Sequence, residues 1–91
     1  MWVVISYDIS SDKRRTKIFE ALKSYGQHVQ YSVFECDLSK QAYAKLRHRL
    51  DALISKSEGD SIRYYFLCEG CAKRIERIGG PQPMSDEAEF V

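Results

Sequence analysis

The chain opens with a short apolar run whose side chains alternate between two faces. WVVISYD, residues 2–8, is rich in β-branched and aromatic residues and has the length of a strand. One face carries Val3, Ile5 and Tyr7. The other face carries Trp2, Val4, Ser6 and Asp8. Because both faces are mostly apolar, we expect this strand to be central in a sheet and covered on both sides.

A helix is predicted directly after this strand, over residues 12–25. The preceding ISSD supplies polar turn residues, and Ser11 or Asp12 is the candidate N-cap. Apolar side chains then recur at helical spacing: Ile18, Phe19, Ala21, Leu22 and Tyr25. Gly26 is a typical residue to follow the end of such a helix.

The segment after Gly26 favours strand again, and a second helix follows it. HVQYSVFECDL, residues 28–38, is long for one strand, so we expect a kink or break near residues 31 and 32. Ser39 is the predicted N-cap of a helix over residues 40–56. Its apolar stripe consists of Tyr43, Leu46, Leu50, Leu53 and Ile54.

The last third of the chain predicts one strong strand, one weak strand and a tail. SIRYYFLC, residues 61–68, alternates between two faces, and one face holds Ile62, Tyr64 and Phe66. RIERI, residues 74–78, predicts a short extra strand. The breaker GGPQP then separates a domain over residues 1–80 from an acidic tail, 81–91, that we expect to be mobile.

The order of these elements is strand, helix, two strands, helix, strand. Two helices against one antiparallel sheet give an α+β fold of the ferredoxin-like βαββαβ type, with the short extra strand at its C-terminal end. The helices cover only one face of the sheet, yet the first strand is apolar on both. The face with Val4, Ser6 and Asp8 therefore needs a partner, and we expect a two-fold homodimer whose sheets pack face to face.

Length and charge narrow the possible classes of protein. Ninety-one residues make one domain with a small core. The net charge is +1, but the three acidic residues of the tail leave 14 basic and 10 acidic residues in the domain, which is compatible with nucleic acid. No apolar run approaches the roughly 20 residues that span a bilayer, and no signal peptide is present, so we expect a cytoplasmic protein without membrane contact.

Three cysteines lie at positions 36, 68 and 71, an odd number that argues against a disulfide framework. The pair in CEGC has the spacing of half a zinc site, but Cys36, His28 and His48 provide no second paired spacing. We interpret the cysteines as small core or turn residues, with zinc ligation as the alternative.

Asp8 is a single carboxylate at the end of an apolar strand. In a face-to-face dimer it would approach Asp8 of the partner subunit, and a divalent cation such as Mg²⁺ would relieve the repulsion between them. Such an ion can activate water and neutralise charge that develops on a phosphodiester. The alternative is that Asp8 accepts a hydrogen bond from the backbone of the following turn.

A basic cluster follows Asp8 at the start of the first predicted helix. Lys13, Arg14 and Arg15 lie where the helix macrodipole disfavours cations, together with free backbone N–H groups. This combination is typical of a phosphate site, and the alternative is a solvated run of charge. The sequence contains no Gly-rich phosphate loop, and neither histidine has the surroundings of a catalytic triad.

Two motifs in this order resemble a known family. YDISSDKRRTKIFEAL, followed by GQHVQYSVFECDLS from Gly26, is similar to the small CRISPR-associated adaptation proteins, the Cas-two family, over residues 1–78. The resemblance implies a ferredoxin-like homodimer with Asp8 as the catalytic and metal-coordinating residue, one from each protomer. It also implies phosphate-contacting or site-shaping roles for residues at the family's motif positions: Tyr7, Arg14, Arg15, Ser32 and Phe34.

The resemblance further implies a role in prokaryotic antiviral defence. Members take part in spacer acquisition with the CRISPR integrase, Cas-one, and are described as Mg²⁺-dependent endonucleases of single-stranded RNA and in some cases of double-stranded DNA. The alternative function is a non-catalytic dimeric adapter that bridges integrase subunits and holds DNA through backbone charge. In this family the last short strand often pairs with the sheet of the partner chain.

Overall fold

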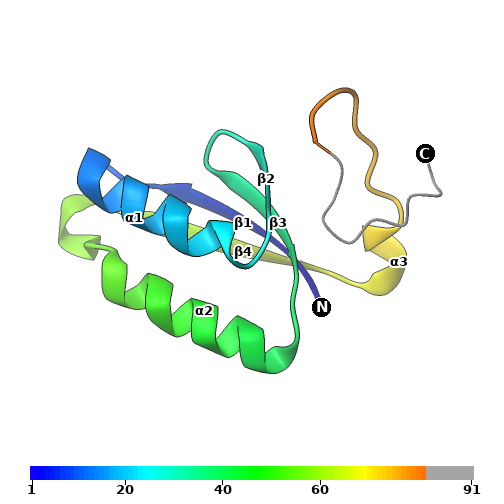
Figure 1. The fold of residues 1–91 in the computed structure, drawn as a ribbon, viewed down its shortest axis with the longest axis horizontal. Helices are drawn as coiled ribbons and strands as arrows, with labels where there is room; N and C mark the ends of the chain where they lie inside the picture. Colours follow the sequence, from blue (N-terminus) through cyan, green and yellow to red (C-terminus); the bar gives the residue numbers. More distant parts are fainter. Residues whose placement is uncertain (82–91) are drawn as a thin grey trace.

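A sheet of four antiparallel strands packs one face against two helices in the computed structural model, which describes residues 1–81 (Figure 1). The elements in chain order are β1 (Trp2–Asp8), α1 (Asp12–Lys23), β2 (Gln27–Gln30), β3 (Val33–Asp37), α2 (Lys40–Leu53), a 3₁₀ turn (Lys56–Glu58), β4 (Ser61–Leu67) and α3 (Glu69–Ala72). The strand order is β2-β3-β1-β4. The predicted α+β fold with the βαββαβ order of elements is therefore confirmed.

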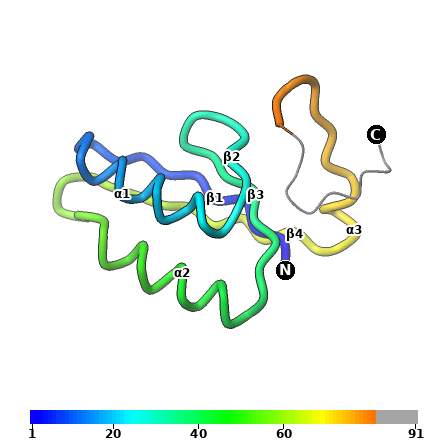
Figure 2. The backbone as a smooth tube through the Cα atoms, viewed as in Figure 1, coloured from blue at the N-terminus to red at the C-terminus, as the bar shows by residue number. Residues whose placement is uncertain are grey.

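β1 is a central strand whose two faces have different surroundings. It pairs with β3 on one side and with β4 on the other, so that Val4 lies between Glu35 and Tyr65. Val3, Ile5 and Tyr7 are buried beneath the helices, as the alternation predicts. Figures 1 and 2 show α1 and α2 side by side on this face of the sheet. The helices leave the opposite face uncovered in the single chain.

Both helices begin at the serines that the sequence indicates. Ser11 Oγ accepts a hydrogen bond from the Arg14 N–H at 3.2 Å, and Ser39 Oγ accepts one from the Ala42 N–H at 3.0 Å. The second helix ends at Leu53, three residues earlier than predicted, because Ile54 adopts an extended backbone. The apolar stripes of both helices complete the core with Ile18, Ala21, Leu22, Leu46 and Leu50.

The predicted break after β2 is confirmed and is a tight turn. Residues 31 and 32 connect β2 to β3, and Ser32 has a positive φ of 62°. This left-handed conformation is uncommon for a residue other than glycine. The Ser32 carbonyl accepts a hydrogen bond from the Tyr7 N–H at 3.1 Å, so the turn is attached to the end of β1.

The structure has no strand at residues 74–78, which corrects the prediction of a short extra strand. A strand needs the backbone of a neighbouring strand, and no described residue pairs with this segment. Figure 2 traces the segment as an open loop after α3. Its side-chain anchor is Arg77, which donates to Glu35 of β3 at 3.1 Å. Apart from Pro81, the predicted mobile tail lies outside the described residues.

Gly26 allows the chain to pass close to β3. A Cβ atom at this position would lie 2.3 Å from Cys36 Sγ and 2.7 Å from the Glu35 carbonyl oxygen, closer than atoms can approach. Its φ is not positive, so the glycine is required by space and not by backbone conformation. The helix-end role that the sequence suggests is therefore secondary to a close approach between α1 and β3.

A buried carboxylate holds together the turn after β1, the start of α1 and the connection before β4. The Asp60 side chain is fully buried and lies 2.7 Å from Arg14 Nε. It also accepts hydrogen bonds from the N–H groups of Ser55 at 2.9 Å and Ser10 at 3.1 Å. The hydrogen bond from Arg14 holds the pKa of Asp60 well below its usual range. The same bonds end α2, because they turn Ser55 toward Asp60.

We expect Gly26→Ala to destabilise the protein by about 1–3 kcal/mol, because the new methyl group must displace Cys36 or the backbone of β3. Urea unfolding measures this change. Gly59→Ala is the matched control for loss of glycine, since a Cβ at position 59 would meet no atom within 4 Å. Any destabilisation by this control comes from the positive φ of 87°, which disfavours alanine, and not from a lack of space. Equal midpoints for wild type and Gly26→Ala would contradict the close approach.

We expect Asp60→Asn to lower the melting temperature at pH 7 by several degrees, because it removes the buried charge that pairs with half-buried Arg14. A carboxyl with a lowered pKa in the folded state stabilises the protein above its unfolded pKa of about 3.9, and this contribution is lost as the pH falls below that value. The difference between the two melting curves should therefore narrow from pH 7 to pH 3. Asp51→Asn, at an exposed carboxylate on α2, is the control. A difference that is independent of pH would contradict the role of the Asp60 charge.

Candidate functional site

Asp8 ends β1 with an exposed side chain on the uncovered face of the sheet. Within residues 1–81 its carboxylate has no hydrogen-bond or ion-pair partner. The turn that follows β1 is held by Asp60 instead, through the N–H of Ser10. The alternative role for Asp8, as a hydrogen-bond acceptor for that turn, is not found, and both carboxylate oxygens remain open to ligands from outside the described chain.

The uncovered face around Asp8 combines apolar and polar rows. Its successive rows across β3, β1 and β4 are Asp37–Trp2–Leu67, Glu35–Val4–Tyr65 and Val33–Ser6–Arg63. Tyr65 is 48% exposed, and its hydroxyl accepts a hydrogen bond from Arg63 at 3.1 Å. Asp8 lies opposite Ser61, beyond the apolar rows. Arg77, from the segment after α3, already covers Glu35 on this face. The exposed Tyr65 beside half-buried Trp2 and Val4 is typical of a surface that another protein covers.

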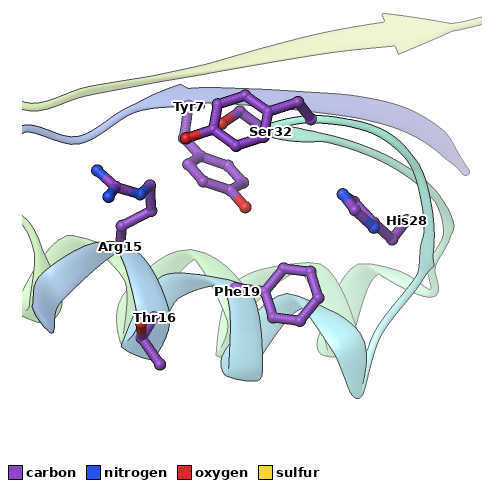
Figure 3. A pocket seen from close by; sticks show the side chains of 7 residues that line it. Tyr7, Arg15, Thr16, Phe19, His28 and Ser32 are labelled. Atoms are coloured by element: carbon purple, nitrogen blue, oxygen red, sulfur yellow. The ribbon is translucent and has the colours of Figure 1, made fainter. Parts of the chain in front are cut away.

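A second feature lies on the helix side of the sheet. A cavity of about 250 Å³ opens between α1 and the β2–β3 hairpin (Figure 3). It is lined by Tyr7, Arg15, Thr16, Phe19, His28, Tyr31 and Ser32. Three predicted site residues, Tyr7, Arg15 and Ser32, therefore come together here. Tyr7 and Asp8 are neighbours in sequence, but they point to opposite faces of β1.

The cavity presents aromatic surface next to one cation. The rings of Phe19 and His28 meet edge to face, with their centroids 5.0 Å apart. Tyr31 at the tip of the hairpin is 79% exposed. Burial raises the pKa of the Tyr7 hydroxyl, so this group remains a neutral donor and acceptor at pH 7. Arg15 donates to the Ile9 carbonyl at 2.9 Å and pairs with Asp12, which fixes its guanidinium at the mouth of the cavity.

The remaining predicted residues lie elsewhere. Arg14 pairs with buried Asp60 and, at 3.5 Å, with Glu58, so its guanidinium is already occupied. Lys13 is exposed in the first turn of α1. Phe34 is fully buried in the core under the helices and lies next to the cavity residues Tyr7, Phe19 and His28. The seven predicted residues thus divide between the open sheet face, the cavity, the start of α1 and the core.

Sequence reasoning missed several residues of this arrangement. Phe19 was assigned to the helix stripe only, and His28 and Tyr31 were assigned to a strand, although all three line the cavity. The predicted break after Tyr31 could have indicated that its side chain lies at an exposed turn. Asp60 lies between the second predicted helix and the strand predicted over residues 61–68, and nothing near it in sequence indicates its partner, Arg14, 46 positions away.

On the open sheet face, Asp8 is the carboxylate that has no partner among residues 1–81 and is therefore available as a metal ligand. Among the described residues no group of three or more His, Cys, Asp and Glu side chains is close enough to hold an ion. Asp8 therefore fits as one ligand of a Mg²⁺ ion that completes its coordination with water, substrate or a second chain. Within the same residues, every helix is too short or too polar to cross a membrane.

Known proteins are similar to this chain along nearly its whole length. The family model described as "CRISPR associated protein Cas2" matches residues 1–75. A protein of Chloroflexus aurantiacus named CRISPR-associated endoribonuclease Cas2 1 is 50% identical over 92 residues, which cover 100% of this chain and 99% of that relative. A Thermus thermophilus protein named CRISPR-associated endoribonuclease Cas2 is 40% identical and covers 87% of this chain and 83% of its own length.

Solved structures match the fold as well as the sequence. Streptococcus pyogenes Cas2 superposes with a TM-score of 0.75 at 34% identity and covers 87% of this chain and 100% of its own. The hypothetical protein TT1823 from Thermus thermophilus superposes with a TM-score of 0.78 at 38% identity, over 90% of this chain and 95% of its own. The resemblance inferred from two sequence motifs is thereby confirmed, and the chain belongs to the CRISPR-associated Cas2 family.

Proposed function

We propose that this chain is a homodimeric, Mg²⁺-dependent endonuclease that acts on single-stranded RNA or double-stranded DNA during CRISPR adaptation, with the CRISPR integrase as its partner. The observation that carries the proposal is Asp8, whose carboxylate has no partner within residues 1–81 and lies on an uncovered sheet face. The names of the relatives, CRISPR-associated endoribonucleases, agree with this reaction.

A homodimer would cover the open face of the sheet. The uncovered face exposes Tyr65 beside Val4, and a second copy of the same face is the simplest surface that buries both. Because Asp8 lies beyond the apolar rows of this face, a two-fold axis near the end of β1 would bring the Asp8 carboxylates of two protomers together. Packing of the sheets would also exclude water from around them, which strengthens their interaction with a cation.

A metal ion would bind at the paired Asp8 carboxylates. Two carboxylates at close range repel each other, and Mg²⁺ accepts one or two carboxylates while it retains several waters. We infer that Asp8 from each protomer holds this ion. When bound, the ion would supply activation of water and neutralisation of the charge that develops on phosphate. The role of Asp8 is to hold that charge at the dimer axis, beside the start of α1.

Nucleic acid would be contacted at the start of α1. Lys13 presents an exposed positive charge on the first turn of α1, close in sequence to Asp8, and is available to phosphate oxygens. The Arg15 guanidinium is held by the Ile9 carbonyl and by the exposed Asp12, so a phosphate that binds it must displace Asp12. The cavity beside Arg15 offers Tyr31 as an exposed ring on which an unstacked base of a single strand can stack. The phosphate contact that the sequence suggests for Arg14 remains a prediction, and we leave it out of the interface because Asp60 already occupies its guanidinium.

A second candidate function is a non-catalytic adapter that bridges integrase subunits and holds DNA by its backbone. One open carboxylate per chain, and no cluster of three or more possible metal ligands within residues 1–81, favour this function over strong catalysis. The two functions make different predictions for Asp8, because only the nuclease needs it.

We expect Asp8→Asn to reduce cleavage of single-stranded RNA about a hundredfold or more, because the amide is a poor ligand for Mg²⁺. In a chelator the variant dimer should melt at the same temperature as wild type or higher, since two repelling carboxylates are gone. Added Mg²⁺ should raise the melting temperature of wild type only. Sedimentation checks that both are dimers.

The control for this variant is Asp51→Asn, at an exposed carboxylate on α2, which should behave as wild type in both assays. Wild-type cleavage by highly purified Asp8→Asn protein would refute the catalytic role. Loss of cleavage without any difference in the response to Mg²⁺ would refute the metal site. Spacer integration that survives Asp8→Asn, together with absent cleavage in the wild type, would favour the adapter.

We expect Lys13→Gln and Arg15→Gln to weaken binding of nucleic acid and to flatten its dependence on salt. Each lost phosphate contact should reduce the slope of log K against log salt concentration by about 0.9 for duplex DNA and about 0.7 for a single strand. Fluorescence anisotropy at several salt concentrations measures the slope. Lys45→Gln, at an exposed position on α2, is the control. Unchanged slopes for both variants would contradict an interface at the start of α1.

A further inference from the structure

Cys68 and Cys71 form an exposed pair outside the proposed nuclease site. They belong to CEGC, which follows β4 directly and includes the single turn α3. Both thiols are free and exposed, whereas Cys36 is fully buried in the core beside Gly26. The expectation that all three are small core or turn residues therefore holds for Cys36 as a core residue, but it leaves two accessible thiols unexplained.

The turn places the two thiols against each other. Cys68 Sγ accepts a hydrogen bond from the Cys71 N–H at 3.2 Å. Cys68 is the N-cap of α3 and Cys71 is the third residue of that turn, so the two side chains lie on the same side of it. A disulfide requires Cβ atoms about 3.5–4.5 Å apart, so closure draws the two ends of the turn toward each other.

The two sulfurs differ in chemical character. The hydrogen bond from the Cys71 N–H lowers the pKa of Cys68, while the neighbouring Cys68 side chain raises the pKa of Cys71. Burial raises the pKa of Cys36 to about 11. Cys68 is thus the nucleophile of the pair, and Cys71 is the second thiol, which closes the disulfide. Buried Cys36 is an unreactive thiol in the same chain for comparison.

We propose that Cys68 and Cys71 are a redox-active dithiol that exchanges with low-molecular-weight disulfides and closes to an intrachain disulfide. Metal binding by one chain is less favoured, since no third or fourth ligand lies near the pair within residues 1–81. The pair lies between β4 and the segment that Arg77 attaches to Glu35. Its disulfide would restrict the backbone of the turn from which that segment starts.

The exchange has two balanced steps. The Cys68 thiolate attacks one sulfur of a disulfide such as glutathione disulfide, forms a mixed disulfide and releases one glutathione thiolate. Cys71 then loses its proton to water or buffer and attacks Cys68 Sγ, which releases the second glutathione. Two protein thiols are oxidised and one glutathione disulfide is reduced to two thiols.

The test is equilibration of the full-length reduced protein, free of metal, with defined ratios of glutathione to glutathione disulfide. Acid quenching, alkylation with N-ethylmaleimide and intact-mass spectrometry then count the free thiols. The expected oxidised product is a monomeric chain that is lighter by two hydrogen atoms and retains one thiol, which becomes alkylated only after unfolding. Cys36→Ser should give the same titration curve as wild type, without the retained thiol.

The single variants separate the two roles. Cys71→Ser should stop at a mixed disulfide with glutathione on Cys68. Cys68→Ser should react about tenfold more slowly at pH 7, because Cys71 Sγ lacks the hydrogen bond from a backbone N–H that stabilises the Cys68 thiolate. The proposal is overturned if wild type accumulates only mixed disulfides or disulfide-linked dimers, if Cys36→Ser abolishes closure, or if the two variants react at equal rates. It is also overturned if stoichiometric Zn²⁺ binds the reduced protein and glutathione disulfide never closes the pair.

Discussion

The buried ion pair between Asp60 and Arg14 is the constraint on which the geometry of the candidate site depends. It joins the turn after β1 and the adjacent first turn of α1 to the chain that enters β4, 46 positions further along the sequence. A buried carboxylate is tolerated only when charge and hydrogen bonds satisfy it, and here one guanidinium and two backbone N–H groups do so. Because this network already holds the turn after β1, no described residue depends on a hydrogen bond to the Asp8 carboxylate.

The sheet separates the two chemical surfaces of the molecule. Asp8 faces the uncovered side, whereas Tyr7, Arg15 and Ser32 surround a cavity on the helix side. Nucleic acid that contacts both must therefore pass around the end of β1 and not across one face. The first turn of α1 begins four residues after Asp8, and Figure 3 shows one of its cations, Arg15, on the cavity side.

Most of the fold could be predicted from local patterns, because alternation in β1, serine caps and apolar stripes are properties of neighbouring residues. The contact of Arg14 with Asp60 could not, since 46 residues separate them and each alone resembles an ordinary surface charge. Strand periodicity also placed Asp8 on the correct face. It could not show that Tyr7 contributes to a cavity, because the opposite wall comes from α1 and the β2–β3 hairpin. The predicted strand at residues 74–78 was wrong for the described chain because pairing depends on a neighbour and not on composition.

Adjacent positions on β1 serve opposite sides of the protein, and this imposes a limit on how the chain can evolve. The deletion or insertion of one residue upstream in the strand would exchange the two sides, so that a tyrosine would replace the carboxylate on the open face. Substitutions can alter either surface alone, but changes in length within β1 affect both at once. Variation in length among related chains should therefore accumulate in the loops and after α3, while the strand that carries Asp8 keeps a constant number of residues.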